Sequence, residues 1–143
     1  RSSKLLGSKL SYMKAIILTF LDYRHRSVRI SAENFSWEGK VLLVVMANGK
    51  YFGSGLCIAP QAEVQDGKLQ VVLLANVSLL DYLKHQGEVR RGEIINHPEV
   101  KYLQTSYCRI EPLEECTIDM DGEFAGYGPV EARVISKGVR FLR

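Results

Sequence analysis

Residues Val41–Gly49 read Val-Leu-Leu-Val-Val-Met-Ala-Asn-Gly and contain the longest apolar run of this 143-residue chain. A short apolar run that is rich in valine and bounded by turn residues is typical of a β-strand buried on both faces. Asn48-Gly49 tolerates positive φ and therefore indicates a tight turn directly after the run. We predict one strand over Lys40–Ala47, preceded by a turn at Trp37–Lys40.

The segments on either side of this run also have the period of β-strands. Ser27–Ser31 alternates polar and apolar residues, as a half-buried strand does. Further apolar or alternating segments follow, each bounded by turn residues. These predicted strands are Leu69–Ala75, Tyr102–Ile110, Cys116–Met120, Val130–Ile135 and Val139–Leu142.

Two segments have helical periodicity instead. Apolar residues recur at helical spacing over Leu10–Tyr23, which predicts an amphipathic helix. A second helix is predicted over Ser78–Gln86, with Ser78 as the N-cap, Asp81 at position N3 and an end before Gly87. Many short strands with one or two helices predict a mainly β fold, a β-sandwich of antiparallel strands.

Composition argues against several classes of protein. The chain is one domain long, with 46% hydrophobic and 24% charged residues, so residues 1–143 are treated as a single domain. A net charge of +3 without a block of Lys and Arg argues against nucleic-acid binding. The apolar run is far shorter than the roughly 20 residues that span a bilayer, so any membrane contact would be peripheral. Three cysteines without CxxC spacing argue against a zinc site or disulfide framework and favour an intracellular, cytoplasmic location.

A glycine-rich segment, Asn48–Gly55, is the first candidate for function. Its three glycines allow the backbone to approach a ligand or another segment closely, and by themselves they predict a tight hairpin with bulges. The sequence contains no GxxxxGK[ST] motif and no GxGxxG between a strand and a helix, so neither common nucleotide-binding loop is present. No GxSxG nucleophile elbow occurs either, so hydrolase chemistry has no support.

Two acidic turns are the other candidates. In Glu63–Leu69, Asp66 stands beside Gly67 and either forms a turn before the next strand, which the residues alone favour, or supplies an oxygen ligand for Mg²⁺. In Asp119–Glu123, three carboxylates alternate along the chain, and Gly122 allows a bend that brings Asp121 and Glu123 toward a common point. Clustered carboxylates attract Mg²⁺ or accept a proton from a hydroxyl, and otherwise they form an acidic turn in solvent.

Taken in order, these segments resemble the C-terminal domain of the diacylglycerol kinase/sphingosine kinase superfamily, in particular lipid kinases of the bacterial diacylglycerol kinase-like family. Spacing and residue identity both agree, and the resemblance covers nearly the whole chain. The matching segments are Gly7–Tyr12, Val45–Gly49, Phe52–Gly55, Ile58–Pro60, Asp66–Leu69 and Ile118–Glu123. The resemblance implies a two-domain enzyme whose N-terminal nucleotide-binding α/β domain, with its Gly-Gly-Asp-Gly-Thr loop, is absent from this chain. On that reading this chain is the C-terminal β-sandwich and is inactive alone.

The resemblance also implies roles for particular residues, with ATP and Mg²⁺ as cofactors. Glu123 matches the general base that takes the proton from the lipid hydroxyl. Asp121 matches the carboxylate that works beside it through Mg²⁺, and Asp121, Gly122 and Glu123 border the nucleotide phosphates. Asp66 matches the side-chain ligand of a second Mg²⁺ site, to which Glu63 and Lys68 contribute backbone carbonyls.

The implied reaction is transfer of the γ-phosphate of ATP to the hydroxyl of a lipid, diacylglycerol or a sphingoid base, at a peripheral membrane surface. A homodimer is compatible with this reading. Two alternatives stay open: a non-catalytic lipid-binding or assembly module with the same fold, and an NAD kinase-like C-terminal domain. The sequence departs from the family pattern at Ser54, where a glycine is frequent, and at Gln70, where an acidic residue is frequent. Gln70 lowers the negative charge near Asp66 and weakens the case for the second metal site.

Overall fold

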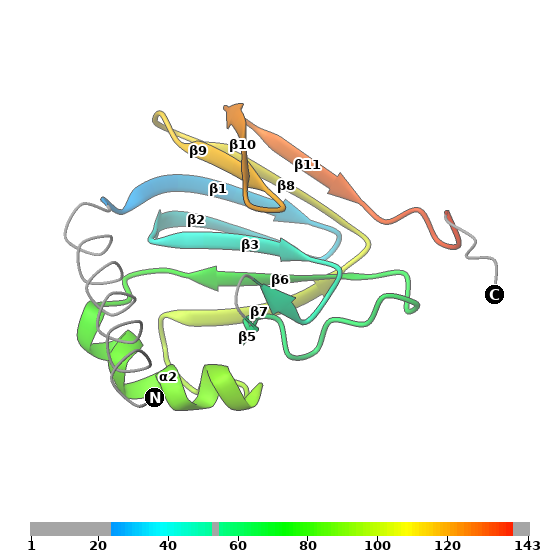
Figure 1. The fold of residues 1–143 in the computed structure, drawn as a ribbon. Coiled ribbons are helices and arrows are strands. Elements are labelled where there is room, and N and C mark those ends of the chain that lie inside the picture. The colour runs from blue at the N-terminus through cyan, green and yellow to red at the C-terminus, as the bar shows by residue number, and fades with distance from the viewer. Residues whose placement is uncertain (1–23, 53–54, 139–143) are drawn as a thin grey trace.

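The structure is a computed structural model that describes residues 24–52 and 55–138 (Figure 1). The predicted helix Leu10–Tyr23 and the predicted strand Val139–Leu142 lie outside these residues. Twelve elements make up the described part of the chain, and antiparallel strands dominate it. The predicted mainly β fold is therefore confirmed.

Two sheets form the body of the protein, and every strand in them pairs with antiparallel neighbours. The first has the order β11-β8-β1-β2 and consists of β1 (Arg26–Ala32), β2 (Phe35–Val41), β8 (Tyr107–Pro112) and β11 (Val130–Arg133). The second has the order β3-β6-β7 and consists of β3 (Leu43–Ala47), β6 (Leu69–Leu74) and β7 (Val100–Thr105).

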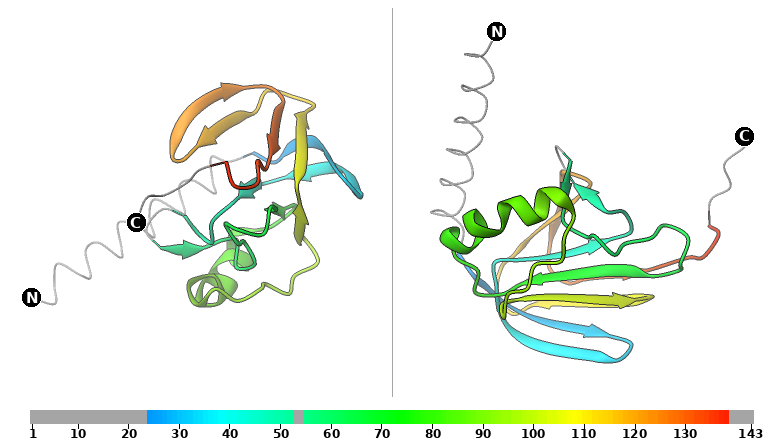
Figure 2. Two further views of the ribbon diagram at one scale, coloured as in Figure 1. Left: turned by 90° about the vertical axis from the view of Figure 1, so that its right-hand side faces the viewer. Right: turned by 90° about the horizontal axis from the view of Figure 1, so that it is seen from below.

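Two hairpins and one helix are added to these sheets. The hairpins pair β4 (Tyr51–Phe52) with β5 (Leu56–Cys57), and β9 (Thr117–Met120) with β10 (Glu123–Tyr127). The helix is α2 (Leu79–Arg91), which lies on one side of the second sheet while β1 and β2 lie on the other (Figure 2, right). The order of layers is thus helix, sheet, sheet.

The core lies between the two sheets and is built by alternate residues of strands from both. Its buried members are Val28, Ile30, Val41, Val71, Leu73, Ala75, Cys108 and Ile110. Val72 points to the opposite face of β6, where it packs with Ala59 and Ala62 in a second cluster. Because both faces of β6 are covered, its sequence is apolar almost throughout, and the prediction of a strand over Leu69–Ala75 is confirmed.

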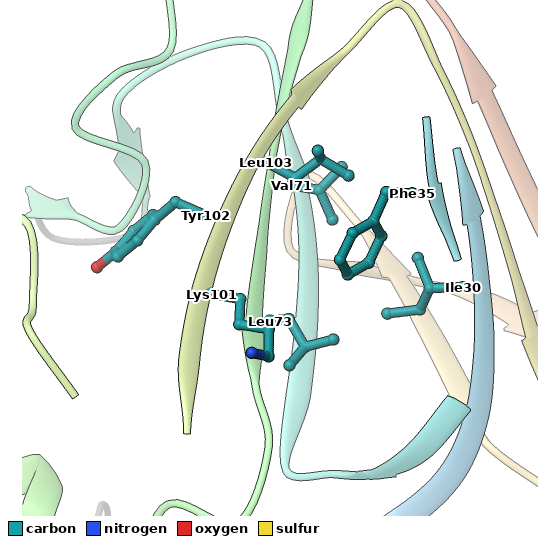
Figure 3. Close-up of a pocket in the computed structure, with 7 residues that line it drawn as sticks. All are labelled: Ile30, Phe35, Val71, Leu73, Lys101, Tyr102 and Leu103. Atoms are coloured by element: carbon teal, nitrogen blue, oxygen red, sulfur yellow. The ribbon is translucent and has the colours of Figure 1, made fainter. Parts of the chain in front are cut away.

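Packing between the sheets leaves one small apolar cavity of about 50 Å³ (Figure 3). Ile30 and Phe35 point into it from the first sheet, and Val71 and Leu73 face them from β6, whereas Tyr102 points away from it.

Cys108 also belongs to the core between the sheets. Burial of its thiol raises the pKa to about 11, so this cysteine is a packing residue without a reactive thiolate.

Several predicted boundaries were wrong: the strand predicted over Val130–Ile135 ends at Arg133, and the largest difference concerns the apolar run itself. The run divides at Leu42, whose N–H points at the carbonyl oxygens of Leu74 and Ala75, at 2.8 and 3.1 Å. Its two parts belong to different sheets, β2 to the first and β3 to the second. The second part is an edge strand with Leu43 37% exposed, so the strand buried on both faces is β6.

The predicted turn at Trp37–Lys40 lies inside β2, where Trp37 pairs with Ile30. Gly39 does not form a turn here, and its lack of a side chain leaves room for the Trp37 ring. A Cβ on Gly39 would lie 2.7 Å from the Trp37 ring, which occupies that space. The predicted strand Tyr102–Ile110 is likewise two strands, β7 and β8, which belong to opposite sheets and are joined at Ser106.

Helix α2 begins as predicted and ends five residues later than predicted. Ser78 is the N-cap, and with Asp81 at N3 it forms a capping box. The helix continues through Gly87 to Arg91 and ends at Gly92, whose φ of 72° is the left-handed conformation that glycine favours at this position. Gly87 is a helix-interior glycine, which the sequence pattern did not distinguish from a terminal one.

Candidate functional site

The Asp121-Gly122 pair forms the two-residue turn of the β9–β10 hairpin. Both residues have positive φ, 51° and 86°, as the turns that match the twist of a tight hairpin require. Met120 and Glu123 are the paired residues that flank the turn, and a bulge at Ala125 follows in β10. The bend predicted at Gly122 is therefore present, and it fixes the backbone of all three residues of the motif.

The carboxylates of this turn face solvent without partners. Asp121 and Glu123 are exposed, and neither makes an ion pair or hydrogen bond within residues 24–52 and 55–138. Two large aromatic side chains of β10 are exposed beside the turn. Phe124 and Tyr127 are both about 60% exposed, and their ring centroids lie 5.2 Å apart in an edge-to-face arrangement. The turn thus presents carboxylates that have no partner in the described part of the chain beside exposed aromatic rings.

The glycine-rich segment forms the β4–β5 hairpin, so the predicted hairpin is confirmed. Tyr51 pairs with Cys57 and Phe52 with Leu56, and the register of these pairs contains no bulge. Gly55 has a φ of 88°, and Tyr51 and Phe52 are exposed. The hairpin lies on the same side of the sheets as the β9–β10 hairpin (Figure 2, left). The two glycine-containing motifs that are far apart in sequence are therefore presented on one side of the molecule.

The Asp66-Gly67 segment is a turn before β6. Asp66 Oδ1 accepts a hydrogen bond from the Lys68 N–H at 2.8 Å, and the Glu63 carbonyl accepts one from the Asp66 N–H at 3.4 Å. These oxygens are two of the donors expected for a second Mg²⁺, and within the described chain no cluster of three or more His, Cys, Asp or Glu stands ready to hold a metal. The turn is present, and the metal site at Asp66, Glu63 and Lys68 stays a prediction.

Gln70, the residue that departs from the family pattern, has a structural role that the sequence did not reveal. Its side chain is 1% exposed. Its Oε1 accepts from the Gln61 N–H at 2.8 Å, and its Nε2 donates to Gln61 Oε1 at 3.2 Å. Gln104 Nε2 donates to the Gln61 carbonyl at 3.0 Å. The amide of Gln70 therefore fixes the segment that follows the glycine-rich hairpin.

An apolar pocket of about 100 Å³ lies between α2 and the second sheet. No residue of α2 is fully buried, so the helix covers the sheet loosely and the pocket opens beneath it. The apolar lining comes from β5, β6, α2 and the segments beside them and consists of Leu42, Leu56, Ile58, Val72, Leu74, Val77, Val89, Ile95 and Val100. The sequence did not identify these positions, because they are separated along the chain and share no motif.

Polar groups are concentrated where α2 meets the segment after it. His97 Nε2 lies 3.7 Å from Asp81 Oδ1, and the rings of His97 and His85 meet edge to face at 5.8 Å. His85 Nδ1 lies 2.6 Å from Glu88 Oε2. Burial raises the pKa of Tyr102, whose hydroxyl oxygen accepts a hydrogen bond from the Ile95 N–H at 3.3 Å. The pocket thus combines an apolar interior with a few polar groups, as ligand sites commonly do.

The capping box of α2 predicts a pH dependence of stability. Hydrogen bonds from Ser78, more than the charge of His97, hold the pKa of Asp81 below its usual value of 3.8. A carboxylate with a lowered folded-state pKa stabilises the fold above its unfolded-state pKa, and this contribution is lost as pH falls through the folded-state pKa. We expect the melting temperature of Asp81→Asn to fall less than that of the wild type between pH 5 and pH 3. The melting temperature is measured by circular dichroism at each pH, and Glu63→Gln serves as the control for loss of an acidic residue. If the melting temperatures of Asp81→Asn and the wild type fall equally with pH, the expectation is wrong.

The two antiparallel sheets and the two added hairpins define a mainly β sandwich domain. The chain belongs to the family described as the YegS C-terminal NAD kinase beta sandwich-like domain, whose model matches residues 1–143. The resemblance found in the sequence is thereby confirmed.

Curated relatives and a solved structure agree with this family. The diacylglycerol kinase of Bacillus subtilis (strain 168) is 23% identical over 127 residues, which are 89% of this chain and 42% of that protein. A Pseudomonas aeruginosa (strain UCBPP-PA14) protein named probable lipid kinase YegS-like is 30% identical over 132 residues, 91% of this chain and 40% of that protein. The solved structure of a candidate diacylglycerol kinase from Bacillus anthracis str. Sterne has the same fold, with a TM-score of 0.71 and 21% identity over 84% of this chain and 42% of that one.

The chain spans about two-fifths of the length of the curated relatives it matches. Among the residues that the structure describes, no helix is both long and apolar enough to cross a bilayer.

Proposed function

We propose that this chain is the C-terminal domain of an ATP-dependent lipid kinase, which transfers the γ-phosphate of ATP to the hydroxyl of a lipid alcohol. Membership of the YegS family and the names of its relatives support this proposal. The observation that carries it is a pair of exposed carboxylates, Asp121 and Glu123, which have no partner among the described residues and stand on a tight hairpin turn. An N-terminal nucleotide-binding domain is the partner that this function requires.

In the proposed reaction, Glu123 accepts the proton from the lipid hydroxyl as the hydroxyl oxygen attacks the γ-phosphorus. The bond from the γ-phosphorus to the β–γ bridging oxygen breaks, and ADP leaves with that electron pair. A carboxylate in this position increases the rate by typically about 10²–10⁴-fold. Asp121, Glu123 and their exposed oxygens suit Mg²⁺, which prefers carboxylate and water ligands, and Asp121 is the residue proposed to hold it. When bound, Mg²⁺ neutralises charge on the phosphates. The positive φ values at Asp121 and Gly122 keep both carboxylates on one short turn.

The pocket under α2 supports a lipid acceptor over a polar one. Its interior is apolar, and β5, which contributes Leu56 to it, belongs to the hairpin on the same side as the Asp121–Glu123 turn (Figure 2, left). Exposed Tyr51 and Phe52 extend this apolar surface along β4.

A lipid-panel assay on the two-domain protein tests the proposal. With ATP and Mg²⁺, we expect phosphorylation of a long-chain lipid alcohol such as diacylglycerol or a sphingoid base, and none of NAD or glycerol. Phosphorylation of NAD would establish the NAD kinase-like alternative instead. Absence of all phosphorylation, in a protein that carries a Gly-Gly-Asp-Gly-Thr loop and binds ATP, would establish the non-catalytic lipid-binding alternative.

A further inference from the structure

Helix α2 has two faces that differ in burial, and the outward face has an unusual composition. The exposed residues of α2 follow the spacing i, i+3, i+4, i+7, i+10 and i+11, which places them on one side of a helix. They are Leu80, Leu83, Lys84, Gly87, Arg90 and Arg91. This set is called the outer face of α2 below.

Charge is segregated between the two faces. All three Lys and Arg residues of α2 lie on the outer face. Both acidic residues, Asp81 and Glu88, lie on the half-buried inner face, where each is within 4 Å of a histidine. Arg91 is bound by Glu93, at 2.7 and 2.8 Å, which leaves Lys84 and Arg90 as the cations of the outer face without an ion pair among the described residues.

The apolar residues of the outer face are exposed well beyond what packing explains. Leu80 is 68% and Leu83 is 38% exposed, and Ile94, just after the helix, is 51% exposed. A large part of their apolar surface is therefore left in contact with solvent. A helix with leucines between flanking cations, and with its acidic groups turned away, has the composition of helices that lie in the plane of an anionic membrane surface.

We propose that the outer face of α2 is the surface by which this domain docks on an anionic lipid bilayer. Leu80 and Leu83 enter the headgroup region, and Lys84 and Arg90 contact lipid phosphates. The inference rests on the proposed function, which explains why the domain would need to contact a bilayer. The inner face of the same helix covers the apolar pocket. A helix held on the bilayer places that pocket next to the layer from which a lipid substrate must come.

Vesicle binding tests this surface without any assay of catalysis. The chain is mixed with phosphatidylcholine vesicles, or with vesicles of phosphatidylcholine and phosphatidylglycerol, and the bound fraction is measured by flotation at low and at high salt. We expect binding only to the mixed vesicles, weakened by salt. Each cation near such a surface contributes roughly 1 kcal/mol, so Lys84→Gln/Arg90→Gln is expected to bind about 30-fold more weakly.

Two further variants distinguish binding through the outer face of α2 from binding through the net positive charge of the chain. Leu80→Gln/Leu83→Gln is expected to bind about tenfold more weakly, because the inserted apolar area is lost. Lys40→Gln/Lys50→Gln removes the same charge from exposed positions on β2 and beside β4 and is expected to bind as the wild type does. The circular dichroism spectrum of each variant is compared with that of the wild type, so that a loss of binding through unfolding is recognised.

Three results would overturn the inference. The first is that the wild type does not bind mixed vesicles, and the second is that the outer-face and control variants lose binding equally. The third is that the chain binds heparin and that mixed vesicles do not displace the heparin. Binding to vesicles is independent of phosphoryl transfer. A protein that docks through α2 and phosphorylates no lipid would support this inference and refute the proposed function.

Discussion

Glu123→Gln in the two-domain protein is expected to lower lipid phosphorylation by about 10²–10⁴-fold, because the amide cannot take the proton of the attacking hydroxyl. The fold should not change. Glu123 is exposed and makes no ion pair or hydrogen bond within the described residues, and glutamine has nearly the same shape. The measurement is the initial rate of lipid phosphorylation, with melting temperature and ATP affinity determined for the same preparations.

Asp119→Asn is the matched control for this variant. Asp119 is also an exposed acidic residue of the β9–β10 hairpin, and it pairs with Phe124 two positions before the turn. It has no role in the proposed reaction, so its variant should retain most of the turnover. Near-normal turnover of Glu123→Gln would remove Glu123 as the general base, and an equal loss in both variants would assign the effect to the hairpin's charge instead.

Gln70→Leu is expected to destabilise the domain by about 1–3 kcal/mol, the largest effect on stability among the changes considered. The substitution removes two hydrogen bonds, one to the Gln61 N–H and one to the Gln61 side chain. The Gln61 N–H then loses its partner beside position 70, which is 1% exposed. A buried polar group without a hydrogen bond costs about 1–3 kcal/mol. Urea unfolding followed by circular dichroism measures the difference.

Gln104→Ala is the control, because Gln104 donates to the carbonyl of the same Gln61 from an exposed position. Water can replace that hydrogen bond, so the expected cost is about 1 kcal/mol or less. If Gln70→Leu unfolds at the same urea concentration as the wild type, the amide network is dispensable. The segment after the glycine-rich hairpin would then be positioned by packing alone.

Features that depend on neighbours in sequence could be predicted. The capping box of Ser78 and Asp81 is local, so the start of α2 was correct. The bend at Asp121-Gly122 depends on conformational preferences of two residues and was also predictable. Leu69–Ala75 was recognised as a strand because an apolar segment of that length in a small β protein serves as a central strand.

Features that depend on distant packing could not be predicted. Gly39 has the sequence signature of a turn, and only the position of the Trp37 ring shows that it serves close packing in β2. The run Val41–Gly49 gives no local sign that its halves enter different sheets. Gln70 interrupts a buried apolar strand, and that interruption was the available signal for a satisfied buried amide. The pocket under α2 brings together segments that lie far apart along the chain and share no motif.

The end of α2 has a mechanical consequence. Gly92 lies so close to Cys57 that a Cβ added at this position would come within 3.1 Å of the Cys57 sulfur. The last turn of the helix therefore rests directly on β5, with no flexible side chain between them to absorb displacement. Because Cys57 belongs to the glycine-rich hairpin, movement of the helix end toward β5 would press directly on that hairpin.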